Sequence, residues 1–215
     1  MTALDAWNDP TPGPTRIKIC GVTEPAHVEA AIAGGANAIG LVRVPESPRF
    51  VDDNTANELA TSAEDRIAVV TLFADPTHDA PHWGTWLQLH GNETQDTVRL
   101  FQERNLTIKA VPWSDAETVL EWDASRCADR LLVDGPRGGS GTSFDHEALA
   151  RIRDQLQTPL LIAGGLDSTS VTKVMQQIGP WGVDVSSGVE SSRGVKDVDQ
   201  ILAFCHAVRQ FDQAS

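Results

Sequence analysis

The sequence reads PLLIAGGLD over residues 159–167 and GVDVSSGVE over residues 182–190, with a helical pattern between them. In each half, a short apolar run typical of a strand buried on both faces ends at a turn of small residues. Glycine lets a backbone approach a ligand closely, and free N–H groups at such a turn can point at an anion. Two ordinary strand-to-helix loops are the plainer interpretation, but we favour a phosphate cradle, because β/α barrels often bind phosphate after their last two strands. The cradle residues would be Gly164, Gly165, Ser187 and Gly188.

Strand and helix patterns alternate along the rest of the chain. Apolar or alternating runs predict six earlier strands, at residues 16–21, 38–44, 67–73, 86–90, 107–111 and 130–134. Further helices are expected at residues 23–34, 52–62, 95–104 and 115–122, from residue 144, and at residues 197–209. This alternation predicts an α/β protein whose parallel sheet closes into a single (β/α)8 barrel, the TIM-barrel fold. An open doubly wound sheet is the alternative, but it would carry its ligand-binding glycines in the first turn rather than the last two.

Two segments are expected to depart from regular barrel structure. Residues 74–85, between the third and fourth strands, contain two prolines and a glycine, which predict a shortened or absent third helix. The first fifteen residues contain three prolines and few apolar side chains, so we expect residues 1–15 to form a flexible N-terminal extension. The barrel would then occupy residues 16–215 as one domain.

The chain is strongly acidic, with 30 acidic and 17 basic residues and a formal net charge of −13. A nucleic-acid partner is excluded by this balance, because phosphate backbones need a basic surface. The acidic residues are spread along the chain, which is typical of a surface that stays soluble where salt screens its self-repulsion. We therefore expect a halophilic host; a mildly acidic protein from an ordinary host is the alternative.

The sequence contains no apolar run long enough to cross a membrane, and its start lacks the basic residues and apolar block of a signal peptide. Its three cysteines, Cys20, Cys127 and Cys205, have no metal-binding or redox spacing. These features predict a cytoplasmic protein with reduced thiols and no metal site.

Few polar side chains fall at the carboxyl ends of the strands, where β/α barrels place their active sites. They are Cys20, Arg49, His90, Asp134 and Asp184. Alternation along the first strand puts Lys18 on the same face as Cys20. A positive neighbour lowers the pKa of a thiol and favours a thiolate base or nucleophile, although a buried, inert cysteine is an equally good interpretation.

The other strand-end residues also allow two interpretations each. Asp134 follows an apolar strand, so it can be a partly protonated general acid or a residue that caps the next turn. Arg49 can bind a planar carboxylate through two parallel hydrogen bonds, or it can lie on the surface. His90 suits a hydrogen-bonded structural histidine, and the glycine-rich segment 137–142 suits either a mobile lid or a plain loop.

Six motifs, in the same order, resemble those of the phosphoribosylanthranilate isomerases, enzymes of tryptophan biosynthesis. They are KICGVT (18–23), PESPRFV (45–51), QLHG (88–91), LVD (132–134) with GGSGTSFD (138–145), AGGL (163–166) and DVSSGVE (184–190). The resemblance covers residues 16–209, nearly the whole chain, and an ordered set of motifs is far more specific than any one of them.

This resemblance implies an Amadori rearrangement of N-(5-phosphoribosyl)anthranilate, a small-molecule substrate, to the 1-deoxyribulose 5-phosphate derivative. By resemblance, Cys20 is the general base that takes the C2′ proton, Asp134 the general acid that protonates the ring oxygen, and Arg49 the ligand of the anthranilate carboxylate. The other expected substrate-binding residues are Lys18, His90, Gly164, Gly165, Asp184, Ser187 and Gly188. Neither a metal nor a cofactor is implied, because proton transfer is sufficient. The chain is expected to be a monomer or a homodimer.

The chain departs from the family pattern at three positions. Arg43 stands where the family often has an aromatic residue, Thr142 where lysine is usual, and His146 where an aromatic residue is usual. The Arg43 and Thr142 changes bear on substrate binding and lid closure, and leave the base and the acid in place. Another sugar-phosphate barrel isomerase, such as the histidine-pathway enzyme, is an alternative, but that relative has an aspartate where this chain has Cys20. A non-catalytic phosphate-binding barrel is a further alternative, against which Cys20 and Asp134 argue.

Overall fold

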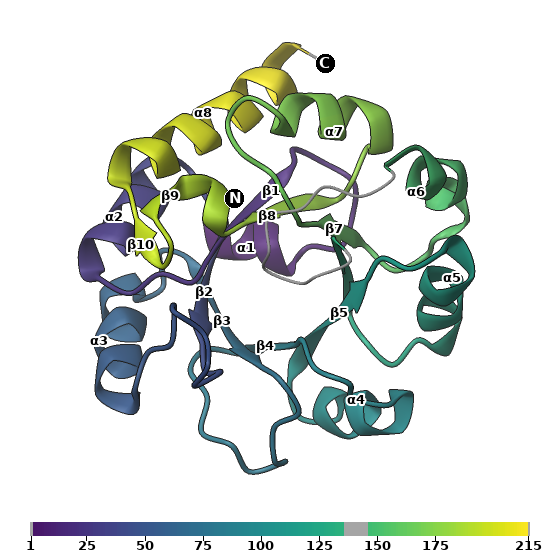
Figure 1. The fold of residues 1–215 in the computed structure, drawn as a ribbon, viewed down its shortest axis with the longest axis horizontal. Coiled ribbons are helices and arrows are strands. Elements are labelled where there is room, and N and C mark those ends of the chain that lie inside the picture. Colours follow the sequence, from purple (N-terminus) through teal and green to yellow (C-terminus); the bar gives the residue numbers. More distant parts are fainter. Residues whose placement is uncertain (1, 136–145, 215) are drawn as a thin grey trace.

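The computed structural model describes residues 2–135 and 146–214. Eight strands form a closed barrel in which each strand is parallel to the next and β8 pairs with β1 (Figure 1). In chain order they are β1 Arg16–Cys20, β2 Ala38–Val42, β3 Ala68–Phe73, β4 Trp86–Leu89, β5 Leu106–Pro112, β6 Arg130–Asp134, β7 Leu160–Ile162 and β8 Gly182–Val185. The predicted (β/α)8 barrel is therefore confirmed, and the open doubly wound sheet is excluded by the β1–β8 pairing.

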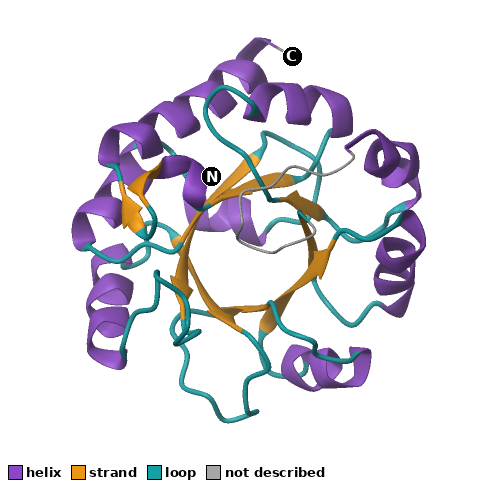
Figure 2. Ribbon diagram, in the orientation of Figure 1, coloured by secondary structure: helices purple, strands orange, loops and turns teal. Residues whose placement is uncertain are grey.

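Helices surround the barrel on its outside (Figure 2). They are α2 Pro25–Ala33, α3 Asp53–Ala63, α4 Gln95–Gln102, α5 Ala116–Ser125, α6 His146–Ile152, α7 Val171–Ile178 and α8 Val198–Ala214. Local sequence sets several helix starts: Asp52, Thr94 and Asp115 each accept a hydrogen bond from the backbone N–H three residues later. None of the helices in the described residues is long and apolar enough to cross a membrane.

The crossover from β3 to β4, residues 74–85, contains no helix along its whole described length, as predicted. It is held by Thr71, whose side chain donates to the carbonyl of Trp83 at 2.7 Å and accepts from its backbone N–H at 2.9 Å. Arg43 also holds it, because the guanidinium group packs over the rings of Trp83 and Phe50 at 5.1 and 5.2 Å. Arg43, one of the departures from the family pattern, thus packs against the crossover that lacks a helix.

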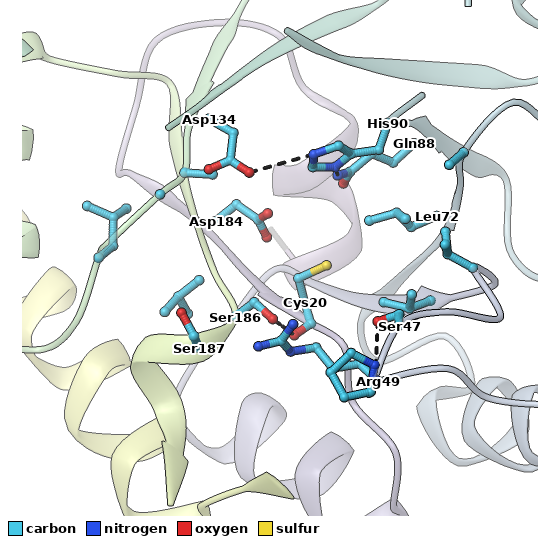
Figure 3. Close-up of a pocket in the computed structure, with 18 of the residues that line it drawn as sticks. Cys20, Ser47, Arg49, Leu72, Gln88, His90, Asp134, Asp184, Ser186 and Ser187 are labelled. Carbon is cyan, nitrogen blue, oxygen red and sulfur yellow. Dashed lines mark hydrogen bonds and ion pairs between the residues drawn. The ribbon is translucent and has the colours of Figure 1, made fainter. Parts of the chain in front are cut away.

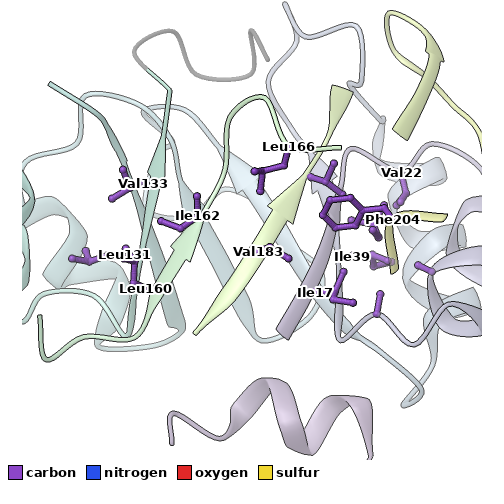
Figure 4. Close-up of a cluster of buried hydrophobic side chains, with 14 of the residues drawn as sticks. Ile17, Val22, Ile39, Leu131, Val133, Leu160, Ile162, Leu166, Val183 and Phe204 are labelled. Carbon is purple, nitrogen blue, oxygen red and sulfur yellow. The ribbon is translucent and has the colours of Figure 1, made fainter. Parts of the chain in front are cut away.

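The main hydrophobic core lies between the strands and the helices (Figure 4). Strand side chains in it are fully buried, among them Ile17, Ile39, Leu131, Ile162 and Val183. Phe204 of α8 packs into the same layer and is also fully buried. This continuous core makes the barrel a rigid frame for side chains at the strand ends.

The amino end of the barrel is closed by α1, Ala3–Asn8, whose Trp7 is fully buried. Trp7 contacts the rings of Trp86 and Trp181, at centroid distances of 5.9 and 5.2 Å. Arg130 packs over Trp86 and Trp181 at 5.2 and 4.6 Å, and burial lowers its pKa to about 10. Residues 2–15 therefore do not form the extension outside the fold that their prolines suggested. One large aromatic side chain gives the segment enough apolar surface to dock.

Two short elements follow β8 at the carboxyl end of the barrel. The 3₁₀ helix η2, Ser187–Val189, leads into a hairpin of β9, Glu190–Ser192, and β10, Val195–Lys196. The backbone N–H of Asp197 then donates to the carbonyl of Val189 at 3.0 Å, which ties the start of α8 to η2. This hairpin places charged residues at the carboxyl end of the barrel.

Candidate active site

A cavity of about 350 Å³ opens at the carboxyl ends of the strands (Figure 3). Its size lies within the range of small-molecule sites, about 300–1,000 Å³. Residues from most strand ends line it, including Cys20 of β1, Val42 of β2, Asp134 of β6 and Asp184 of β8. The barrel thus gathers at one place side chains that lie far apart in the sequence.

Cys20 lies beside a buried ion pair at the end of β1. Lys18 is fully buried and donates to Asp184 Oδ1 at 2.9 Å. Burial would lower the pKa of Lys18, but Asp184 and Cys20 outweigh burial and raise it, so Lys18 stays charged. Burial also raises the pKa of the Cys20 thiol, and the charge of Lys18 offsets only part of that rise. The thiol therefore favours its protonated form, so the thiolate that the sequence offered as one of two interpretations is not the main form near neutral pH.

Asp134, at the end of β6, lies across the cavity from Cys20 in Figure 3, with Asp184 between them. It is nearly buried, and its Oδ1 accepts the backbone N–H of Gly135 at 2.7 Å. His90 Nε2 lies 3.6 Å from Asp134 Oδ2, and His90 Nδ1 lies 3.1 Å from Gln88 Nε2. Burial lowers the pKa of His90, more than the nearby carboxylates raise it. A neutral His90 thus contacts both the buried carboxyl group and a buried amide.

The two predicted phosphate-cradle turns approach each other closely. Gly164, Gly165 and Ser187 line the cavity, and both glycines have positive φ, at 87° and 69°. At Gly188, an added Cβ would lie only 1.8 Å from the carbonyl oxygen of Leu166, so a side chain cannot be accommodated there. Glycine is therefore required for the packing of the η2 turn against the turn after β7.

Arg49 lies at the rim of the cavity, in the loop after β2, near Ser186 and Ser187 in Figure 3. Its guanidinium group donates from Nε and Nη2 to the two carboxylate oxygens of Glu190, at 2.6 and 2.9 Å. Arg49 is nearly buried, which rules out the plain surface arginine. The sequence did not predict Glu190 as its partner.

The structure brings most of the predicted residues to one cavity. Those that line it are Cys20, Arg49, His90, Asp134, Gly164, Gly165, Asp184 and Ser187. Lys18 lies behind Cys20, and Gly188 supports the cradle by packing on the neighbouring turn. Sequence reasoning missed Gln88, Ser186 and Arg193, which also line the cavity. The position of Gln88, two residues before His90 on one strand face, is a signal that could have identified it.

The glycine-rich segment 137–142, considered as a lid, and Thr142 lie outside the described residues. Within residues 2–135 and 146–214, there is no group of three or more His, Cys, Asp or Glu side chains that could hold a metal ion. Cys127 and Cys205 are buried free thiols, as expected for inert cysteines.

The fold and the composition of the cavity place the chain among the (β/α)8-barrel enzymes. The family model for N-(5'-phosphoribosyl)anthranilate (PRA) isomerase matches residues 17–207. The chain belongs to this family.

Known proteins of the same family resemble the chain along almost all of its length. The N-(5'-phosphoribosyl)anthranilate isomerase of Halorhodospira halophila is 39% identical over 212 residues, which cover 93% of this chain and 99% of the relative. The crystal structure of the Thermotoga maritima phosphoribosyl anthranilate isomerase matches with a TM-score of 0.84 and 29% identity, covering 91% and 99% of the two chains. A phosphoribosyl anthranilate isomerase in complex with reduced 1-(o-carboxyphenylamino)-1-deoxyribulose 5-phosphate matches with a TM-score of 0.81, 29% identity and the same coverage. The relatives come from diverse bacteria, so family membership does not support the expected halophilic host.

Proposed function

We propose that the chain catalyses the Amadori rearrangement of N-(5-phosphoribosyl)anthranilate in tryptophan biosynthesis. The observation that carries this proposal is the placement of Cys20 and Asp134 on one cavity, with the Gly164–Gly165 and Ser187 turns beside them. A thiol, a carboxyl group and an anion-binding turn are what acid–base isomerisation of a sugar phosphate requires. The match to the phosphoribosylanthranilate isomerase family supports the substrate assignment.

The proposed roles follow the order of the bonds that change. Asp134 gives a proton to the ribose ring oxygen, the C1′–O bond breaks, and an iminium group forms at C1′. Cys20, as thiolate, then takes the C2′ proton, which leaves an enol amine. A proton added at C1′ and one lost from the C2′ hydroxyl give the ketone product. Charged Lys18 stabilises the thiolate of Cys20 by Coulomb attraction and hydrogen bonding.

The remaining candidate residues would bind the substrate. Arg49 would bind the anthranilate carboxylate, because a guanidinium group can hold a planar carboxylate through paired hydrogen bonds. Gly164, Gly165, Ser187 and Gly188 would hold the phosphate, mainly through backbone N–H groups. His90 and Asp184 would contact the sugar, because both line the same cavity as Arg49 and the cradle turns.

The proposal is tested by fluorescence-monitored turnover of phosphoribosylanthranilate by the intact chain, in low and in high salt. Turnover that falls severely in Asp134→Asn, with little change in substrate binding, is the expected result. A folded wild-type chain that binds inorganic phosphate but does not turn over phosphoribosylanthranilate would instead be a non-catalytic phosphate-binding barrel. An Asp134→Asn variant that binds poorly yet turns over normally would assign Asp134 to positioning alone.

We also propose a salt-rich cytoplasm as the environment of the enzyme. The acidic composition supports a protein adapted to a salt-rich cytoplasm, because salt screens the repulsion among carboxylates. A monomer or a homodimer is the proposed assembly.

A further inference from the structure

Glu190, at the start of the β9–β10 hairpin, lies behind Arg49 as viewed from the cavity. Arg49 lines the cavity, whereas Glu190 does not, and the Glu190 side chain is only 3% exposed. Its carboxylate accepts four hydrogen bonds. Oε1 accepts from Arg49 Nε at 2.6 Å and Lys196 Nζ at 2.7 Å, and Oε2 accepts from Arg49 Nη2 at 2.9 Å and the Gly194 N–H at 3.0 Å. A carboxylate has about four acceptor sites, so Glu190 is saturated.

The way in which Glu190 binds Arg49 leaves part of the guanidinium group available. Glu190 occupies the side edge, formed by Nε and Nη2. The end edge, formed by Nη1 and the second N–H of Nη2, can bind another carboxylate in the same plane. Among the described residues, none accepts a hydrogen bond from Arg49 Nη1. The guanidinium group can therefore hold Glu190 and a substrate carboxylate together.

The stem of Arg49 is fixed as well. An added Cβ at Gly21 would lie 2.6 Å from Arg49 Cδ, so the arginine chain lies directly on the backbone next to Cys20. At Gly194, in the hairpin turn, an added Cβ would lie 2.7 Å from the carbonyl oxygen of Pro48. The hairpin thus packs on the residue before Arg49, and both ends of this arginine are held.

The same network reaches the strand that carries Cys20. The Lys196 side chain is fully buried and donates to the carbonyl oxygen of Ser186 at 2.9 Å, with the Ser186 hydroxyl at 3.2 Å. The Ser186 hydroxyl donates to the carbonyl oxygen of Cys20 at 3.1 Å (Figure 3). Lys196 and Ser186 therefore link Glu190, and with it Arg49, to the backbone of Cys20.

We propose that Glu190 is a positioning residue for the isomerase reaction, which holds the side edge of Arg49 so that its end edge binds the substrate carboxylate at a fixed distance from Cys20. This inference rests on the proposed function. Burial would raise the pKa of Glu190, but the hydrogen bonds from Arg49 and Lys196 lower it to about 2, so the carboxylate stays charged at working pH. A competing role, in which Glu190 blocks Arg49 until substrate displaces it, disagrees with the four bonds that retain the carboxylate.

Two ligands distinguish a positioning role of Glu190 from a blocking role. They are reduced 1-(o-carboxyphenylamino)-1-deoxyribulose 5-phosphate and its counterpart without the carboxyl group. The measured quantity is the ratio of their dissociation constants, which reports carboxylate recognition alone. In Glu190→Gln, we expect the preference for the carboxylate form to fall about 10-fold, because a charged hydrogen-bond acceptor that orients Arg49 is lost. Inorganic phosphate affinity should stay unchanged. The matched control is Glu29→Gln, since Glu29 also binds an arginine, Arg66, through both carboxylate oxygens, but at an exposed site on α2.

An unchanged preference in a folded Glu190→Gln variant would overturn the proposal, and an increased preference would identify Glu190 as a competitor. A structure of the wild-type chain with the carboxylate ligand gives a test that does not depend on the variant folding. We expect Glu190 to keep both bonds to Arg49 while the ligand carboxylate contacts Nη1. An Arg49 that leaves Glu190 in this complex, or a carboxylate bound elsewhere, would also overturn it. Turnover of phosphoribosylanthranilate by the wild type tests the proposed function separately.

Discussion

Cys20 is the residue on which the proposed chemistry depends most directly. Replacing its thiol by the hydroxyl of serine keeps the size but gives a group that is hard to ionise. General-base catalysis typically contributes about 10²–10⁴-fold, so we expect Cys20→Ser to lower kcat by at least about that factor. The measurement is steady-state turnover, with the unfolding transition checked to show that the fold is intact. Near-normal turnover in a folded Cys20→Ser variant would remove Cys20 from the mechanism.

The pH dependence of the reaction follows from the environment of the same thiol. Burial raises the pKa of Cys20, and Lys18 offsets only part of the rise, so the reactive thiolate is the minor form at neutral pH. Its fraction grows as pH rises. We therefore expect kcat/KM to increase from about pH 6 to about pH 9, and the rate of Cys20 alkylation to increase in parallel. A rate that is flat or falling over this range would show that thiolate formation does not limit the reaction.

Gly165 tests the phosphate cradle at the scale of one residue. Its φ of 69° lies in the left-handed region, where a β-branched side chain is strained, and its turn lines the cavity. We expect Gly165→Val to weaken the binding of substrate and of inorganic phosphate together, as measured by titration. Gly179→Val is the matched control, because Gly179 has a similar φ of 60° but an added Cβ there meets no atom within 4 Å. Unaltered phosphate binding in a folded Gly165→Val variant would contradict the cradle.

Single residues also show why part of the site could not be predicted. Cys20, Asp134 and the cradle glycines follow strands directly, so their strand-end position was visible in the sequence. Glu190 was not recognised as the partner of Arg49, because the two are separated by 141 positions and meet only when the hairpin folds over the loop after β2. The sequence also did not show that burial raises the pKa of the Cys20 thiol. The strand pattern identifies neighbours along one strand, such as Lys18, but it does not show how far the closed barrel removes the thiol from water.

At the scale of elements, strands and most helices were predictable because their signals are local. Apolar runs predicted the strands, and side-chain caps such as Asp52 and Thr94 mark helix starts. The lack of a helix between β3 and β4 was predictable from the prolines of residues 74–85. The helix α1 was missed because six residues are too few to show a helical period clearly, and its stability comes from docking on the barrel.

The docking of α1 predicts how the barrel responds to its loss. Trp7→Ala removes a fully buried side chain from the contacts with Trp86 and Trp181, and such changes cost about 3–5 kcal/mol. We expect a clearly lower Tm in thermal unfolding, with turnover preserved well below that temperature because the cavity lies at the other end of the barrel. Thr2→Ala, which removes only the helix cap, should cost about 1 kcal/mol. If residues 1–15 were a flexible extension, neither variant would change Tm.

At the scale of the whole molecule, a net charge of −13 has opposite consequences for folding and for substrate binding. Self-repulsion among exposed carboxylates opposes the compact state, and the same negative field gives no long-range attraction for a phosphorylated, carboxylated substrate. Binding must then rely on local groups. In the proposed site, Arg49 and the backbone N–H groups of the cradle would provide these within the cavity, where screening by salt is weaker than at the surface.

Because the repelling carboxylates lie on the surface and the binding groups lie in the cavity, we expect salt to affect stability and binding differently. Potassium chloride shortens the range of surface repulsion, so we expect Tm to rise as the salt concentration increases from dilute buffer to about 1 M. Replacing the exposed carboxylates of Glu58, Glu103 and Glu121 by glutamine should raise Tm in dilute buffer and reduce its dependence on salt. Inorganic phosphate affinity in the cradle should change less across the same series, because the neutralised side chains are exposed and do not line the cavity. A chain that is most stable in dilute buffer and loses stability in molar potassium chloride would show that repulsion between carboxylates does not limit its folding, and the proposal of a salt-adapted surface would then be wrong.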